Sequence, residues 1–132
     1  MKKPLLLYAA TAAVMLVLDA LWLGLVATQL YSQGIGHLMA AEPRLGVAAL
    51  FYLLYPVGLV VFAVGPSTGW RNAAWKGALF GFFAYATYDL TNLATLKDWP
   101  VWLAALDIAW GTLVSGVSAA AGGVAKERLA RR

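Results

Sequence analysis

Four long apolar stretches follow one another along the chain, and short polar segments separate them. They run from about residue 5 to 30, 45 to 64, 73 to 96 and 101 to 124. At about 1.5 Å per residue, each is long enough to cross the roughly 30 Å hydrocarbon core of a bilayer as a helix. None alternates like a barrel strand, and a helix satisfies its own backbone hydrogen bonds in lipid. The pattern predicts an all-α integral membrane four-helix bundle, in one domain over residues 1–132.

The first stretch differs from a signal peptide, although Lys2 and Lys3 precede it. It is longer than the apolar core of a signal peptide, which has about 7–15 residues, and it continues to Leu30 without a clear cleavage site. We therefore expect a retained helix. The connections carry residues typical of helix ends, such as Glu42-Pro43 before the second span and Gly65-Pro66 after it.

The composition supports a membrane location. The chain is 62% hydrophobic and 12% charged, whereas soluble domains carry about 25% charged residues. Its formal net charge of +4 would suit nucleic acid, but in so apolar a chain membrane topology explains the basic residues better. The chain has no cysteine, which excludes disulfides, thiolate catalysis and cysteine-ligated metals. The sequence thus predicts membrane lipid, and not nucleic acid, as a partner.

Basic residues flank the predicted spans unevenly. Eight of the ten lysines and arginines fall at the two termini or around the connection between the second and third spans, and Arg44 and Lys97 fall on the other side. Connections rich in Lys and Arg stay in the cytoplasm. We therefore expect an N-in/C-in topology. The basic tail consists of Lys126, Arg128, Arg131 and Arg132.

Small residues recur every four positions in the last two spans. Gly77 and Gly81 in the third span and Gly111 in the fourth would let these helices approach closely. We expect the second span, which contains Gly58, to face lipid more. Spacing of this kind does not by itself predict a dimer, so the sequence leaves a homo-oligomer open.

Three acids interrupt the predicted spans: Asp19, Asp89 and Asp107. An acid near the middle of a spanning helix costs about 2.5–3.5 kcal/mol on insertion, so three in one small protein need a reason. Counted from the outer helix ends at about 1.5 Å per residue, they lie at depths of about 15, 12 and 10 Å. Three helices therefore place an acid in one layer of the outer half.

Aromatic and amide side chains share this acidic layer. Trp22 follows Asp19 by three residues, and Trp110 follows Asp107 by three, so each indole shares a helix face with an acid. The layer predicts a polar cavity with aromatic walls that opens to the outside. The candidate ligand-binding residues are Asp19, Trp22, Tyr52, Tyr55, Tyr85, Tyr88, Asp89, Asn92, Asp107 and Trp110.

A purely structural role for these residues stays open. A buried Asp can hydrogen-bond Trp, Tyr or Asn across helices and so hold a bundle together, and aromatic residues often mark the membrane interface. The sequence predicts no metal or cofactor site, because His37 stands alone in a connection and no phosphate loop, HExxH motif or nucleophile elbow occurs. It identifies no catalytic residue.

Four segments of the chain are similar to one known family. They read DALWL in the first span, FYLLYP in the second, YATYDLTNLATLKDWP at the end of the third and DIAWG in the fourth. Together they resemble a family of small four-helix bacterial inner-membrane proteins known only as a domain of unknown function, over nearly the whole chain. The resemblance implies a multi-pass protein of the bacterial inner membrane but no activity. The residues that match its motifs are Asp19, Trp22, Tyr88, Asp89, Asn92, Lys97, Trp99, Pro100, Asp107 and Trp110.

Three functions are consistent with the acidic layer. Binding or transport of a small ligand, a cation or protons is favoured, because carboxylates supply charge and aromatic faces add cation–π attraction. An intramembrane enzyme acting on a lipid or another apolar substrate would use Asp89 or Asp107 as general acid or base, with Asn92 and Tyr88 orienting the substrate. The third function is that of a non-catalytic accessory or assembly subunit.

Reporter fusions test the predicted topology. A reporter fused after Arg132 is expected on the cytoplasmic side, and one inserted within residues 34–41 on the opposite side, because eight of the ten basic residues lie on the side of the termini. Alkaline phosphatase, which is active outside the cytoplasm, and a fluorescent protein measure the two locations in cells. A C-terminus outside the cytoplasm would contradict the orientation and the depths derived from it.

Overall fold

The computed structural model describes residues 2–131, so Met1 and Arg132, the last residue of the predicted basic tail, lie outside the described residues. The described chain is helical from end to end, with short connections and no strand between residues 2 and 131. The elements are α1 (Lys2–Leu21), η1 (Trp22–Ala27), α2 (Thr28–Ile35), η2 (Gly36–Leu38), α3 (Leu45–Leu59), η3 (Val60–Val64), α4 (Trp70–Thr95) and α5 (Val101–Ala130).

These elements form four rods, which confirms the predicted all-α four-helix bundle. The first rod is longer than expected, because the chain stays helical through Tyr31 to Ile35 and ends in a turn of 3₁₀ helix at Leu38. The fourth rod also continues beyond residue 124, as far as Ala130, through residues with high helix propensity. The second and third rods agree with the expected spans to within a few residues.

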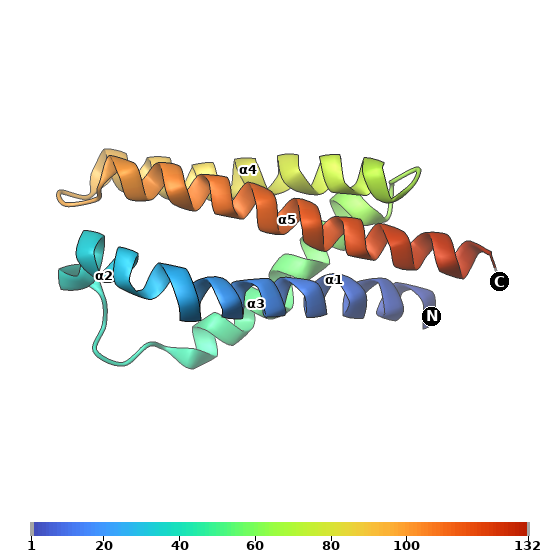
Figure 1. The fold of residues 1–132 in the computed structure, drawn as a ribbon, viewed down its shortest axis with the longest axis horizontal. Coiled ribbons are helices and arrows are strands. Elements are labelled where there is room, and N and C mark those ends of the chain that lie inside the picture. The colour runs from blue at the N-terminus through green and yellow to red at the C-terminus, as the bar shows by residue number, and fades with distance from the viewer. Residues whose placement is uncertain (1, 132) are drawn as a thin grey trace.

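The rods are arranged around α5 (Figure 1). α4 and α5 lie side by side along their length, and α1 packs on the other side of α5, while α3 runs at an angle to these three helices. Both termini lie at one end, called here the terminal end, and residues 36–44 and 96–100 lie at the other, the loop end (Figure 1). That the terminal end is cytoplasmic stays a prediction.

Glycines set the short distance between α4 and α5. A Cβ atom added at Gly81 would collide with the Ser115 Oγ atom and the Gly111 carbonyl oxygen, and one added at Gly77 would collide with Ala119. The predicted close packing of the third and fourth spans is therefore confirmed. Any larger side chain on these faces would force the two helices apart.

Three of the rods are long and apolar enough to cross a membrane, namely residues 2–38, 45–64 and 101–130. α4 has 26 residues, but it carries Arg71 and Lys76 near its start and three exposed threonines near its end. The hydroxyl groups of these threonines donate to backbone carbonyls one turn earlier, as from Thr87 to Phe83 at 2.6 Å. Their hydrogen-bond donors are therefore satisfied within the helix and would not be exposed unpaired to lipid. That α4 also spans the membrane stays a prediction.

The end of α5 holds the connection between η3 and α4. The Lys126 ammonium donates to the carbonyl oxygens of Gly65 at 2.6 Å and Ser67 at 2.9 Å. The neighbouring Glu127 carboxylate accepts the Trp70 backbone N–H at 2.9 Å. A cation thus satisfies carbonyls at a helix C-terminus, and an anion satisfies an N–H at a helix N-terminus, as the helix dipoles favour.

The glycine at position 81 gives a direct test of the packing. Gly81→Leu is expected to reduce the free energy of unfolding by about 1–3 kcal/mol or more, because overpacking forces α4 away from α5. The measurement is the midpoint of thermal unfolding in detergent, which should fall by several degrees. The matched control is Gly46→Leu, since a Cβ atom at Gly46 meets no atom within 4 Å.

Gly58, which the sequence suggested as a lipid-facing control, is unsuitable. A Cβ atom there would lie 2.8 Å from the Phe80 ring of α4. The expectation was wrong at this position, because η3 and the end of α3 near Gly58 pack against α4. Equal destabilisation by Gly81→Leu and Gly46→Leu would contradict the assignment of the helix faces.

Candidate functional site

A wide turn in the first rod shapes one side of the site. Residues Trp22–Ala27 form a π-helix, in which each turn holds an extra residue. The Thr28 hydroxyl donates to the Leu23 carbonyl across this turn. The helix then resumes as α2, which carries Tyr31 back toward the bundle. Single-turn π-bulges of this type are common at functional sites.

Asp19 joins three of the four rods. Its buried carboxylate accepts a hydrogen bond from the Tyr52 hydroxyl of α3 at 2.8 Å and one from the Trp110 indole of α5 at 2.9 Å. Both oxygens of a charged group are therefore satisfied inside the bundle. Asp19 thus makes hydrogen bonds to Tyr and Trp on neighbouring helices, which is the purely structural role that the sequence left open for a buried acid.

Asp107 belongs to a second hydrogen-bonded group. It accepts from the Tyr31 hydroxyl at 2.7 Å, and the Tyr31 oxygen accepts from the Trp22 indole at 3.3 Å. The Trp22 ring stacks on the Trp110 ring with centroids 4.4 Å apart and planes 6° from parallel. Because Trp110 also binds Asp19, the stacked indoles connect the hydrogen-bonded groups of Asp19 and Asp107.

Asp89 differs from the other two acids, because it is fully buried and its carboxyl group accepts no hydrogen bond from the described residues. It is 0% exposed, and neither carboxyl oxygen has a hydrogen-bond partner among residues 2–131. Its polar neighbours are the Asp107 carboxyl group and the Trp99 indole. The Trp99 indole nitrogen is likewise buried without a partner within the described chain. Buried polar groups are normally satisfied, so this carboxyl group calls for an explanation.

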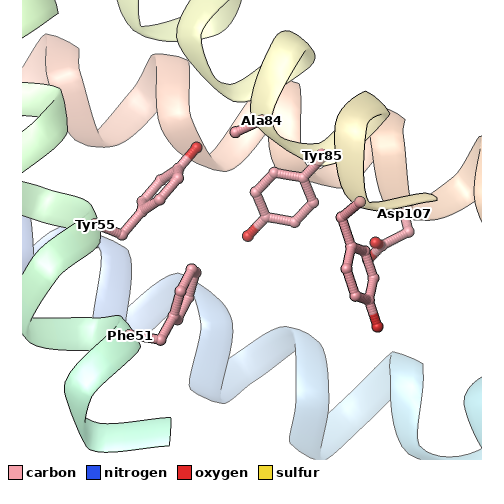
Figure 2. Close-up of a pocket in the computed structure, with 6 residues that line it drawn as sticks. Phe51, Tyr55, Ala84, Tyr85 and Asp107 are labelled. Carbon is pink, nitrogen blue, oxygen red and sulfur yellow. The ribbon is translucent and has the colours of Figure 1, made fainter. Parts of the chain in front are cut away.

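A cavity of about 370 Å³ lies between α3, α4 and α5 (Figure 2). The Phe51 and Tyr55 rings extend into it from α3 toward the Tyr85 ring of α4, and the Tyr55 and Tyr85 centroids are 6.1 Å apart. The Tyr55 hydroxyl is 2.6 Å from the Ser115 hydroxyl, which fixes this ring at the wall. The residues that line this cavity are Phe51, Tyr55, Ala84, Tyr85, Tyr88 and Asp107.

A smaller cavity of about 140 Å³ adjoins the first. The two share Phe51, Tyr85 and Asp107 as lining residues, so Asp107 stands at the boundary between them. The smaller cavity contains the two hydrogen-bonded groups described above. Its lining residues are Asp19, Trp22, Leu23, Tyr31, Phe51, Tyr52, Tyr85, Asp107 and Trp110.

The larger cavity opens through the side of the bundle. η3 packs closely against α4, whereas α3 packs mainly against α1, so α3 diverges from α4 toward the loop end. Phe51 and Tyr88, on opposite sides of the cavity, are 40% and 53% exposed.

Eight of the ten candidate residues line the two cavities, and two do not. Asp89 neighbours Asp107 but lines neither cavity. Asn92 lines neither, and its backbone carbonyl instead accepts the Leu96 N–H near the end of α4 at 2.8 Å. Its side chain neighbours Tyr88, a residue of the cavity wall, but is not itself part of the lining.

Three polar or aromatic residues of the site are not among the candidates predicted from the sequence. Tyr31 lies just beyond the expected end of the first span at Leu30, whereas the helix in fact continues through it. Phe51 stands beside Tyr52 in the FYLLYP segment and was not considered. Ser115 follows Asp107 by eight residues, a spacing that puts both toward one face of the helix.

The rods and their buried acids define a helical membrane protein with a carboxylate-containing cavity. The family model described as "Predicted membrane protein (DUF2177)" matches residues 4–124, which is nearly the whole chain. The chain therefore belongs to this family of predicted membrane proteins, whose function is unknown, as the resemblance of its motifs indicated. No curated protein and no solved structure matches the chain.

Proposed function

We propose that this protein binds a small amphipathic cation in the larger cavity, with the Asp107 carboxylate as the counter-ion. The observation that carries the proposal is the combination of an aromatic wall and one carboxylate in a cavity of about 370 Å³. Ligand pockets usually have volumes of about 300–1,000 Å³. The cavity therefore suits a small ligand.

The chemistry of the wall favours a cation over an anion or a neutral sugar. Four tyrosine or phenylalanine rings line the cavity, and each offers a π face or edge; they belong to Phe51, Tyr55, Tyr85 and Tyr88. A cation over such a face gains about 0.5–2 kcal/mol, and more when water is excluded. The single charged group in the lining is the acidic Asp107, and no lysine or arginine accompanies it.

The route of entry favours an amphipathic molecule. The gap between α3 and α4 would lead from the bilayer to the cavity, and large apolar side chains such as Leu50, Leu54 and Phe83 are exposed on these helices. Such surfaces suit contact with membrane lipid as the surrounding partner. Family membership supports a membrane location, and the basic-residue bias supports a multi-pass arrangement with both termini in the cytoplasm. The membrane we propose is a bacterial inner membrane, as the resemblance of the motifs implies.

An intramembrane enzyme is the alternative function that a separate observation favours. The side opening and the neighbouring carboxyl groups of Asp89 and Asp107 would also suit an intramembrane enzyme that acts on a lipid, with one acid as donor and the other as base. An enzyme would change the mass of a lipid on incubation, whereas a binding or transport protein would release its ligand unchanged. Mass spectrometry of the recovered lipid separates the two functions.

Calorimetric titration tests the proposed binding. Purified protein in lipid nanodiscs is titrated with benzyltrimethylammonium, which combines an aromatic ring with a permanent positive charge. Asp107→Asn keeps the shape of the side chain but removes its charge, and the Kd is expected to rise about tenfold or more, which corresponds to a loss of about 1.4 kcal/mol. Asp98→Asn, which removes an exposed acid in the loop between α4 and α5, is the matched control and should leave the Kd unchanged.

Two results would contradict the proposal. If the cation does not bind to the unchanged protein, the accessory or assembly role becomes the better account. If Asp107→Asn binds it as tightly as the unchanged protein does, the carboxylate is not the counter-ion. Thermal unfolding of each variant shows whether a loss of binding reflects a loss of fold.

A further inference from the structure

The buried carboxyl group of Asp89 neighbours Asp107 but is not part of the wall of either cavity. From its geometry we infer that Asp89 and Asp107 share one exchangeable proton, and that a cation bound in the cavity replaces this proton. The inference rests on the proposed function and deepens it from binding to proton-for-cation exchange.

The first argument is the state of the Asp89 side chain. A carboxylate that is 0% exposed and accepts no hydrogen bond within residues 2–131 would be an uncompensated buried charge, which is costly. A proton removes that charge. It also gives the carboxyl group an O–H donor, for which the neighbouring Asp107 carboxylate is the available acceptor.

The second argument is what surrounds the pair. The titratable groups that interact with Asp89 are Asp107 from α5, Tyr31 from α2 and Tyr88 from α4 itself. No lysine, arginine or histidine is among them, so no basic side chain neutralises the pair. Two neighbouring carboxyl groups without a basic partner cannot both ionise at low cost, and they hold a proton in common.

The donor set argues for a proton and against a metal ion. A hard metal cation takes about six oxygen ligands, whereas the surroundings of Asp89 offer a second carboxyl group and an indole N–H. Within the described residues, no group of three or more His, Asp or Glu side chains is arranged to hold a metal ion. A proton needs only the two carboxyl groups.

Asp107 connects the pair to the ligand, because it faces both Asp89 and the cavity. In the free protein the pair carries one proton and one negative charge. When an organic cation binds against Asp107, the shared proton leaves for solvent as H⁺. The charges of the two ionised carboxylates are then offset by the cation, which lies against Asp107, and by the Trp99 indole N–H, which neighbours Asp89. One positive charge enters and one leaves, so the net charge of the site does not change.

Calorimetry in two buffers counts the released protons. Benzyltrimethylammonium is titrated into the protein in nanodiscs at neutral pH, once in phosphate and once in Tris, whose heats of ionisation differ. The difference between the two apparent enthalpies should correspond to about one proton released for each cation bound. Binding without proton release overturns the exchange but leaves the proposed binding intact, whereas an absence of binding overturns the proposed function.

Two variants and a second measurement locate the proton. Asp89→Asn keeps Asp107 and the cavity wall, so it should still bind the cation but release almost no proton. Asp98→Asn should behave like the unchanged protein. Continued release of one proton by Asp89→Asn would show that the proton does not reside on the pair.

Infrared spectroscopy detects the proton without any ligand. The free protein should show the C=O band of a protonated carboxyl group, and this band should be absent from Asp89→Asn and should disappear when the cation is added to the unchanged protein. A free protein without this band would overturn the inference even where the cation binds.

Discussion

The cost of burying carboxyl groups governs the arrangement of this bundle. Asp19 meets that cost by accepting hydrogen bonds from Tyr52 and Trp110, which lie on two other rods. Those bonds set the register of α1 against α3 and α5, since a shift of either helix by one residue would leave the carboxylate unsatisfied. The register in turn stacks Trp22 on Trp110 and places Tyr31 against Asp107.

The cavity results from a difference in how closely the helices pack. Glycine residues and small serine side chains let α4 and α5 come into close contact, while α3 packs mainly on α1 and approaches α4 closely near its end and through η3. Aromatic side chains fill part of the resulting gap and leave a cavity beside Asp107. Stability and cavity thus have separate origins: the close α4–α5 contact holds these two helices together, and the divergence of α3 from α4 leaves the cavity open.

The four helices follow from the sequence, because apolar length and helix-ending residues are local properties. The acidic layer also follows, because depth along a helix is counted at about 1.5 Å per residue. The sequence does not reveal the π turn at Trp22–Ala27 or the divergence of α3 from α4, since both depend on packing between distant residues. For this reason the sequence does not predict the contact of Tyr31 with Asp107. It also does not predict that both carboxyl oxygens of Asp89 lack a hydrogen-bond partner, since that depends on how the neighbouring helices pack.

The central claim is that acids from different helices serve one ligand cavity. An experimental structure in the presence of an iodinated benzyltrimethylammonium tests it most directly, because the iodine atom can be located by its anomalous scattering. The account predicts an iodine peak between Phe51 and Tyr85, with the ammonium group against Asp107. A cavity closed by packed side chains, with Asp107 turned to lipid and the iodine elsewhere, would contradict it.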